Sequence, residues 1–334
     1  MKFSGYAARQ AGGKLEPFAY DPKTLEPTDV EIAITHCGLC HSDIHLVDND
    51  WEVSEYPLLP GHEIVGTVTD CGSEVSDLKK GDRVAVGWQC GACLSCELCI
   101  DGDDHLCPDH RATCVGNPGG FADRIRVDGR FVFVLPEELE SETVGPLMCG
   151  GITVYAPFRY YNVRPSDRVG VIGIGGLGHL ALQFAGAFGC EVTAFSTSSS
   201  KAEEAIILGA HHFVNITEAD ALEKAAGSID FLLSTVHVDL DWNAYIDILR
   251  PNGTLCLVGA SPGPVSVQPM ALILKRKCIC GSPIGSRSAI REMLDFSARH
   301  GIQAQVETLP MNRINDAFDR VRANKARYRM VLTN

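Results

Sequence analysis

The stretch from Val169 to Ser200 constrains the fold of this chain more than any other. It begins with the apolar run Val169–Ile172, continues through six residues rich in glycine at 173–178, and then carries apolar residues at helical spacing up to Phe188. A second apolar run follows at 192–195. Short apolar runs suit strands that are buried on both faces. The pattern therefore predicts strand, glycine turn, helix and strand, which is how a dinucleotide-binding fold begins.

The glycines of this turn have separate physical tasks. Gly173 permits the tight turn, Gly175 lets the backbone approach a pyrophosphate, and Gly178 permits close packing of helix against strand. The N–H groups at the start of the helix would then face the phosphates. A glycine turn with no ligand is the alternative, but the flanking strands and helix favour a dinucleotide site. Its predicted residues are Gly173, Gly175, Gly176, Leu177 and Gly178.

The residues after the second strand bear on which dinucleotide is bound. An NAD-binding protein usually has an Asp or Glu there, which hydrogen-bonds to the adenosine ribose. Here the sequence at 196–201 is Ser-Thr-Ser-Ser-Ser-Lys, and the next carboxylate is Glu203. Hydroxyls and a lysine can hold a 2′-phosphate, which a carboxylate would repel. A solvated loop is the alternative. We predict NADP(H), bound by Ser196, Thr197, Ser198 and Lys201.

Composition narrows the class of protein. With 334 residues, of which 45% are hydrophobic, the chain can hold one large or two medium domains. A net charge of −13 argues against nucleic acid as a partner. No apolar signal segment or bilayer-spanning run is present, so we predict a cytoplasmic protein with no membrane partner. In a reducing compartment, fourteen cysteines are better explained as metal ligands than as disulfides.

Four of the cysteines lie close together, with the spacing C-x2-C-x2-C-x7-C from Cys93 to Cys107. Thiolates at this spacing can converge on one tetrahedral ion, and four of them leave no open position for chemistry. We therefore predict a structural zinc held by Cys93, Cys96, Cys99 and Cys107. Spacing alone leaves a second set open, in which Cys90 replaces Cys99. A redox thiol cluster is a further alternative.

The predicted elements divide the chain into three parts. Short strands and turns predict a β-rich domain over residues 1–149. Alternating strands and helices predict a doubly wound parallel sheet over 150–284. Residues 285–334 contain two helices and a last strand that could return to the first domain. The fold class is therefore α/β.

Two predicted helices are specific enough to be checked. One is expected over Thr143–Tyr161, where the pattern of elements changes. The other is expected over Trp242–Leu249 and would end at Pro251-Asn252-Gly253, since proline and glycine commonly follow a helix.

Three further residues fit a second kind of metal site. A catalytic zinc takes three protein ligands and keeps one position for substrate or water. Cys40 follows a predicted glycine turn, and His62 follows Pro60-Gly61. Cys149 precedes Gly150-Gly151 at the edge of the predicted dinucleotide domain. A lone Cys or His is more often a core residue, so the spacing leaves both interpretations open.

At these residues the chain resembles the zinc-dependent medium-chain alcohol dehydrogenases. Within that family it is similar to the cinnamyl alcohol dehydrogenase branch, which includes bacterial NADP-dependent aldehyde reductases. The family fold implies a GroES-like catalytic domain and a Rossmann domain. The matching motifs cover nearly the whole chain and are GLCHSDIH (38–45), YPLLPGHEIVG (56–66), CLSCELCIDGDDHLC (93–107), PLMCGGITVY (146–155), GIGGLGH (173–179), STSSSK (196–201) and ARYRMVL (326–332).

The resemblance implies roles for the residues of the second metal site. Cys40, His62 and Cys149 would be the ligands of the catalytic zinc. Glu63 would be the carboxylate that can approach the metal when the fourth ligand leaves, and Asp43 would orient the ligand histidine. Without the resemblance, a solvated charge for Glu63 and a turn-forming role for Asp43 would be preferred.

The resemblance also selects Cys99 over Cys90 for the structural zinc, which gives two zinc ions per chain. Cys37 and Cys71, like Cys90, are extra thiols with no predicted role. The stretch 114–121 is shorter than its usual counterpart in the family, so the pocket rim or the metal lobe could differ. Trp51 is a candidate for the substrate pocket, with a buried aromatic as the alternative.

The implied reaction is reversible hydride transfer between NADP(H) and an aromatic or medium aliphatic aldehyde or primary alcohol. Zinc would polarise the carbonyl oxygen, and Ser42 would donate a proton that is relayed through the nicotinamide ribose to His45. Local turn capping is the alternative for both side chains. His41 would contact the pyrophosphate, and family members are commonly homodimers. A zinc-free quinone or enoyl reductase and a redox-sensing NADP-binding protein are the two alternative functions.

Overall fold

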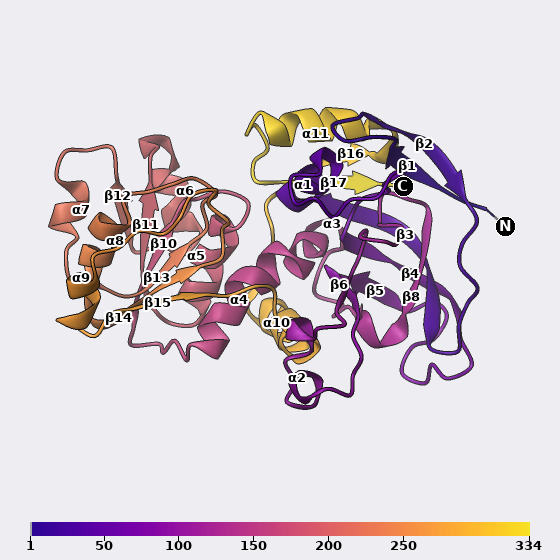
Figure 1. The fold of residues 1–334 in the computed structure, drawn as a ribbon, viewed down its shortest axis with the longest axis horizontal. Helices are drawn as coiled ribbons and strands as arrows, with labels where there is room; N and C mark the ends of the chain where they lie inside the picture. Colours follow the sequence, from indigo (N-terminus) through magenta and orange to yellow (C-terminus); the bar gives the residue numbers. More distant parts are fainter. Residues whose placement is uncertain (1) are drawn as a thin grey trace. The chain divides into compact units, whose positions relative to one another are not determined.

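The computed structural model describes residues 2–334, which form two compact units. Unit 1 contains the residues up to Ile152 together with Gly285–Asn334, and unit 2 is Thr153–Ile284. The indigo and yellow ends of the ribbon in Figure 1 both belong to unit 1. Within residues 2–334, no helix is both long and apolar enough to cross a membrane.

Unit 1 is built on a seven-stranded sheet with the order β16-β17-β3-β4-β5-β9, in which β8 also pairs with β3. The apolar side chains of Val30, Ile32 and Ile34 in β3 are buried and belong to its main core. Only β16 and β17 pair in parallel. The strands are β3 (Asp29–Leu39), β4 (Glu63–Cys71), β5 (Arg83–Val86), β8 (Arg124–Asp128), β9 (Val132–Val134), β16 (Val306–Pro310) and β17 (Arg329–Thr333).

The register of this sheet brings three strand ends together. Gly38 in β3 pairs with Glu63 at the start of β4. Leu39, the last residue of β3, pairs with Met330 at the start of β17. Residues that flank these ends are therefore neighbours in space although they are far apart in the sequence.

Smaller elements surround this sheet in unit 1. Helix α10 is the longest, and it begins where Ser286 Oγ accepts a hydrogen bond from the Ala289 N–H and ends at Gly301 in a left-handed conformation. The other elements are β1 (Phe3–Ala8), β2 (Leu15–Tyr20), α1 (His41–Asp48), β6 (Gln89–Gly91), α2 (Glu97–Ile100), β7 (Arg111–Ala112), α3 (Ser141–Val144), α10 (Arg287–His300) and α11 (Ile314–Arg322), with 3-10 turns at Asp104–Leu106, Gly129–Phe131, Gly145–Met148 and Met311–Arg313.

Unit 2 is a six-stranded sheet with the order β12-β11-β10-β13-β14-β15, and all its pairings are parallel. This confirms the predicted doubly wound sheet. The strand order reverses between β10 and β13, and ligands of such sheets bind beyond the strand ends at that point. The strands are β10 (Arg168–Ile172), β11 (Glu191–Ser196), β12 (His212–Asn215), β13 (Ile229–Ser234), β14 (Leu249–Leu257) and β15 (Cys278–Gly281). The helices are α4 (Gly150–Tyr160), α5 (Gly178–Ala187), α6 (Ala202–Ile207), α7 (Ala221–Lys224), α8 (Trp242–Ile248) and α9 (Pro269–Ile273), with a 3-10 turn at Ser199–Lys201.

Two predicted helices were wrong in their extent. The helix expected over 143–161 is three short helices, and the break between the last two falls at Cys149 (φ −125°, ψ −73°). The helix expected to reach Leu249 ends at Ile248, and β14 begins at once. Residues 249–253 belong to β14, but the pairing with β13 is irregular there: Leu249 pairs with Ile229, the next paired residue is Thr254, and Asn252 between them has a left-handed conformation (φ +67°).

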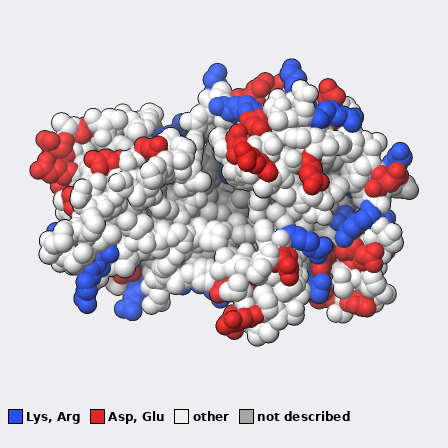
Figure 2. All heavy atoms as spheres, viewed as in Figure 1, with Lys and Arg blue, Asp and Glu red and all other residues white. Residues whose placement is uncertain are grey.

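Charged side chains are mixed on the face of the molecule shown in Figure 2. Lysines and arginines lie among aspartates and glutamates there and do not form one continuous basic patch.

Candidate metal centres and nucleotide site

Four side chains from separate parts of unit 1 meet at the strand ends described above. The ligand atoms of Cys40, His62, Glu63 and Cys149 all lie within 4.8 Å of one another. Cys40 directly follows β3, while Glu63 opens β4 immediately after His62. Cys149 occupies the break before α4, and its Sγ lies 3.9 Å from that of Cys40. The sheet register and this break therefore place the predicted set of residues in one cluster.

Asp43 holds two of these residues in place. Its Oδ1 lies 2.9 Å from His62 Nδ1 and accepts a hydrogen bond from the Gly61 N–H, also at 2.9 Å. Its Oδ2 accepts one from the Cys40 N–H at 2.9 Å, which caps α1. Asp43 is fully buried. It therefore does cap a local turn, as the alternative proposed, but it also fixes the orientation of a histidine from another segment.

The donor set fits a zinc ion. Because Asp43 uses Nδ1 of His62, the buried Nε2 is left facing the two thiols, with no hydrogen-bond partner within residues 2–334. Two cysteine sulfurs and one imidazole nitrogen are a ligand set that zinc favours when it keeps an open position. A buried nitrogen without a partner is costly in the absence of a ligand, and a metal ion would satisfy it.

The two thiols of this cluster are electrostatically unequal. A hydrogen bond from Cys149 holds the pKa of Cys40 well below its usual value, although burial opposes this. The same hydrogen bond and burial raise the pKa of Cys149. A bound zinc ion would take both groups as thiolates.

Glu63 forms a buried ion pair with Arg329, whose side chain comes from β17. Burial raises the pKa of Glu63 to about 7, although the positive charge of Arg329 acts in the opposite direction. The interpretation of Glu63 as a solvated charge was wrong, since the residue is fully buried. Arg329 lies within the motif at 326–332, but sequence reasoning gave it no role.

Gly38 makes room for the Glu63 side chain. A Cβ at Gly38 would lie 2.0 Å from Glu63 Oε2, so only glycine fits at this position of β3. The glycine turn predicted before Cys40 is absent within residues 2–334, because Gly38 and Leu39 belong to β3 and Cys40 directly follows that strand.

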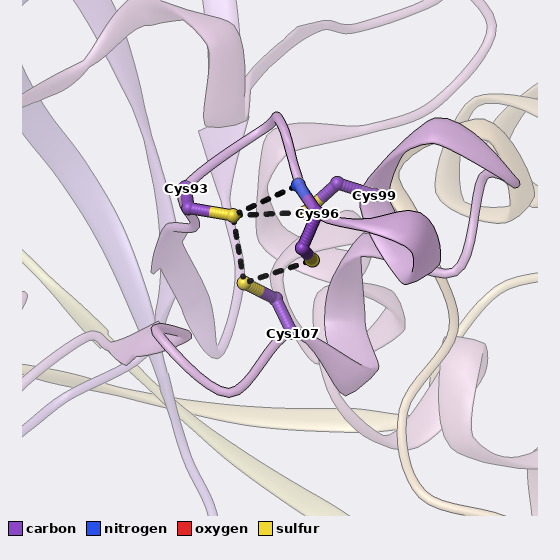
Figure 3. Close-up of side chains that lie close together, drawn as sticks. All are labelled: Cys93, Cys96, Cys99 and Cys107. Atoms are coloured by element: carbon purple, nitrogen blue, oxygen red, sulfur yellow. Dashed lines mark hydrogen bonds between the residues drawn. The ribbon is translucent and has the colours of Figure 1, made fainter.

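The second cysteine cluster is shown in Figure 3. Sulfur–sulfur distances are 3.5 Å from Cys107 to Cys93 and 3.9 Å from Cys96 to Cys107 and from Cys93 to Cys99. Backbone N–H groups of Ser95 and Cys96 donate to Cys93 and lower its pKa to about 6. Four convergent sulfurs match a closed tetrahedral zinc site.

Cys90 stands apart from that cluster. It lies in β6, where it lines a cavity of about 230 Å³ together with Arg111 and Thr113. Burial raises the pKa of its thiol. The fold therefore brings together the set that contains Cys99, and not the alternative set that contains Cys90.

Helix α1 carries the residues predicted for the proton relay. The Cys40 thiol lies 3.7 Å from Ser42 Oγ, and His45 Nδ1 lies 2.7 Å from Asp50 Oδ2. The His41 and His45 rings are 6.0 Å apart. Sequence reasoning missed Asp50, because a contact between side chains five residues apart depends on how α1 ends.

Aromatic rings border the His62 side of the cluster. The Trp88 ring lies 4.9 Å from the His62 ring and 6.1 Å from that of Trp51, edge-on in both cases. Trp51 is exposed to 41% rather than buried. Trp88 was missed by sequence reasoning. Cys114 was also missed, and its sulfur lies within 4.8 Å of ligand atoms of Asp43 and His62.

The glycine turn of unit 2 has the conformation that a dinucleotide site needs. Gly173 has φ +85°, and a Cβ at Gly178 would lie 1.9 Å from the Gly173 carbonyl oxygen. A Cβ at Gly175 would meet nothing within 4 Å, so Gly175 is not required by contacts within the protein. Gly176 and Leu177 complete the turn, and α5 begins at Gly178.

Lys201 is tied to this turn. Its Nζ donates a hydrogen bond of 2.5 Å to the Ile174 carbonyl oxygen, which brings its charge from the end of β11 to the glycine turn. Nearby, Ser196 Oγ accepts from the Ser198 N–H at 3.2 Å, while Thr197 is exposed. The hydroxyl groups and the ammonium group therefore belong to one anchored segment and not to a loose solvated loop.

Comparison with known proteins gives consistent matches over both units. Residues 26–137 match the family model of the alcohol dehydrogenase GroES-like domain, and residues 176–299 match that of the zinc-binding dehydrogenases. An aldehyde reductase from Synechocystis sp. is 45% identical over 329 residues, which are 98% of this chain and 98% of that protein.

Solved structures agree with the sequence matches. A cinnamyl alcohol dehydrogenase from Sorghum bicolor has a TM-score of 0.95 and 37% identity, covering 100% of this chain and 98% of that one. A cinnamyl alcohol dehydrogenase from Helicobacter pylori, solved with NADP(H), has a TM-score of 0.91 and 32% identity, covering 100% of this chain and 99% of that one.

Proposed function

This chain belongs to the zinc-type medium-chain alcohol dehydrogenases, in the branch of the cinnamyl alcohol dehydrogenases, and we propose that it is an NADPH-linked reductase of aldehydes. The reaction class, alcohol dehydrogenase and aldehyde reductase, is that of its relatives at up to 45% identity. The single observation that carries the proposed site is the buried, unpartnered Nε2 of His62 facing the sulfurs of Cys40 and Cys149.

The two zinc ions would have different tasks. Cys40, His62 and Cys149 would hold an ion that supplies Lewis-acid polarisation of the substrate oxygen. Glu63 forms an ion pair with Arg329, and it would be available as a fourth ligand of this ion. Cys93, Cys96, Cys99 and Cys107 would hold the structural ion.

Ser42 and His45 would handle the proton that the reduced product requires. Ser42 Oγ lies beside the Cys40 sulfur and so close to the proposed metal. The side chain of His45 is 34% exposed and is oriented by Asp50, so it can pass a proton to water. We propose Trp51 and Trp88 as an apolar wall that suits aromatic or medium aliphatic aldehydes.

NADPH would be held by unit 2 and would supply the hydride. The backbone N–H groups of the glycine turn would bind the pyrophosphate, and Ser196, Thr197, Ser198 and Lys201 are proposed to bind a 2′-phosphate. The hydrogen bonds that connect Ser198 with Ser196 and Lys201 with Ile174 support this proposal. His41, which starts α1 in unit 1, is proposed for a pyrophosphate contact. The neighbour from Helicobacter pylori was solved with NADP(H), which supports this choice of dinucleotide.

We also propose that the protein is a cytoplasmic homodimer. All fourteen cysteines are free thiols, as expected in a reducing compartment. Met270, Ile273 and Leu274 expose between 55% and 74% of their surface on unit 2 and offer an apolar contact for a second copy. Sedimentation of the purified protein tests this, and a monomer at micromolar concentration would contradict it.

The proposed function is tested with a panel of aldehydes, supplied with NADPH or with NADH, and with metal analysis of the same preparations. We expect turnover with NADPH and two zinc ions per chain. Cys40→Ser should abolish turnover while NADPH binding survives, whereas Cys71→Ser, which alters a thiol outside both clusters, should keep activity. Full activity without zinc would favour a zinc-free reductase, and NADPH binding with no turnover would favour a redox sensor.

Cofactor choice needs its own variant. In Lys201→Ala we expect kcat/KM with NADPH to fall by roughly 10- to 100-fold, because a hydrogen bond to a charged group contributes about 1.5–3 kcal/mol. The value with NADH should change little. Equal loss with both cofactors, or equal activity of the unaltered enzyme with both, would contradict the proposed 2′-phosphate site.

A further inference from the structure

Two cysteines outside both metal clusters lie side by side in unit 2. Cys256 in β14 and Cys280 in β15 are directly paired in the register of the parallel sheet. Adjacent strands are about 4.8 Å apart, and their paired side chains point to the same face. This separation falls within the range of roughly 4.4–6.8 Å between Cα atoms that a disulfide requires. The two thiols shift each other's pKa in opposite directions.

The two thiols differ in reactivity. Interaction with Cys256 lowers the pKa of Cys280 to about 7, against the effect of burial. Interaction with Cys280 and burial raise the pKa of Cys256. A large fraction of Cys280 is therefore thiolate at neutral pH, and the thiolate is the reactive form of cysteine.

Tyr161 keeps the arrangement in register. It follows α4, and its Oη donates a hydrogen bond of 2.6 Å to the carbonyl oxygen of Gly281, the residue after Cys280. This contact holds the phenol against the end of β15, beside the Cys280 sulfur.

The two thiols differ in their exposure to solvent. β15 is the last strand of the six-stranded sheet, and Cys280 is partly exposed there. Cys256, in the strand next to it, is fully buried. A small oxidant can therefore reach Cys280 first. Cys256 is buried beside it and can react with the oxidised sulfur.

We propose that Cys280 and Cys256 form a site for oxidation by hydrogen peroxide, separate from the dehydrogenase chemistry. The Cys280 thiolate attacks one peroxide oxygen: an S–O bond forms, the O–O bond breaks, and the departing hydroxide takes a proton to leave as water. The Cys256 sulfur then attacks the sulfur of the sulfenic acid. An S–S bond forms, the S–O bond breaks, and hydroxide leaves as water with the Cys256 proton.

In total, two thiols lose two electrons and two protons, and one peroxide becomes two waters. A dithiol reductant reverses the reaction by exchange, so in a reducing compartment the disulfide would be transient.

The test uses the reduced, zinc-loaded protein, treated with about one equivalent of hydrogen peroxide and then alkylated and digested for mass spectrometry. We expect a disulfide-linked pair of peptides that contain Cys256 and Cys280, and its loss after dithiothreitol. Cys278, which is exposed on the same strand, is the internal control and should stay alkylatable. Free Cys256 and Cys280 under conditions that oxidise Cys278 would overturn the proposal.

One variant separates the two steps. Cys256→Ser should stop at the sulfenic acid of Cys280, which dimedone traps. In the unaltered protein, alkylation of Cys280 should slow about fivefold between pH 7 and pH 6, as expected for a pKa of about 7. An alkylation rate that does not change over this range, or no dimedone adduct on Cys280 in Cys256→Ser, would contradict the mechanism. These readouts are masses, so they are independent of whether the protein reduces aldehydes.

Discussion

His62 Nδ1 lies 2.9 Å from Asp43 Oδ1, and both side chains are fully buried in unit 1. This contact decides which imidazole nitrogen is free, and therefore which atom faces Cys40 and Cys149. The same carboxylate accepts hydrogen bonds from the backbone N–H groups of Cys40 and Gly61. One aspartate thus sets the positions of two proposed ligands, although it is not one itself.

The role of Asp43 can be tested by changing its charge and keeping its shape. Asp43→Asn should weaken zinc binding at the Cys40–His62–Cys149 site by about 10- to 100-fold, as expected when the partner of a ligand histidine is altered. Competition with a chromogenic chelator measures this affinity. Asp50→Asn, which alters the partner of His45, is the matched control and should keep its zinc. Unchanged affinity in Asp43→Asn would show that the histidine needs no such partner.

The structural cluster makes a different prediction. Cys96→Ser should lose one of two zinc ions and lower the thermal midpoint by several degrees, because loss of a metal is among the most destabilising single changes. Cys90→Ser, next to the cluster in sequence but outside it in space, should keep both ions. Loss of zinc from the Cys90 variant would instead support the alternative ligand set.

The glycine turn offers a pair of substitutions with opposite expected effects. Gly178→Ala should destabilise unit 2, because the new Cβ would lie 1.9 Å from the Gly173 carbonyl oxygen. Gly175→Ala should leave stability nearly unchanged, since nothing in the protein lies within 4 Å of its Cβ position. It should nevertheless weaken NADPH binding if the backbone there approaches the pyrophosphate. Calorimetric melting measures the stability of both variants, and titration measures their NADPH affinity. Unchanged NADPH affinity in Gly175→Ala would contradict a close approach of this backbone to the pyrophosphate.

We expect Glu31 to contribute to the loss of stability of unit 1 at acidic pH. Burial alone would raise its pKa, but hydrogen bonds from Arg126, Thr69 and Arg124 outweigh burial and hold the pKa below its ordinary value of 4.5. A lowered pKa in the folded state stabilises the fold above the ordinary pKa, and this contribution is lost as the pH falls through the folded value. Urea unfolding at pH 7 and pH 3.5 should therefore show a smaller loss for Glu31→Gln than for the unaltered protein. The exposed Glu138→Gln is the control.

Local patterns were sufficient wherever the physical requirement is itself local. The turn at Gly173–Gly178 and the cysteines from Cys93 to Cys107 each need only a short segment, so their spacing was informative. The same approach was wrong by one residue at Leu249, which belongs to β14 and not to the helix because it pairs with Ile229 of β13.

Contacts between distant segments were beyond such reasoning. Arg329 reaches Glu63 across 266 positions, and no spacing rule connects them. Trp88, which contacts His62 from another segment, was missed for the same reason, and so was the pairing of Cys256 with Cys280, which depends on the order of strands in a sheet. Asp50 was missed because its contact with His45 depends on how α1 ends.

Residue patterns were enough to predict the parallel-sheet unit, the closely spaced cysteine cluster and the family, because alternation, glycine turns and ligand spacing act within a few residues of each other. They could not show that Gly38 lies within a strand beside Glu63, that His62 presents Nε2 to two sulfurs, or that Cys90 lies outside the cysteine cluster. These outcomes depend on strand register and burial, and both are set by the packing of segments that are remote from one another along the chain.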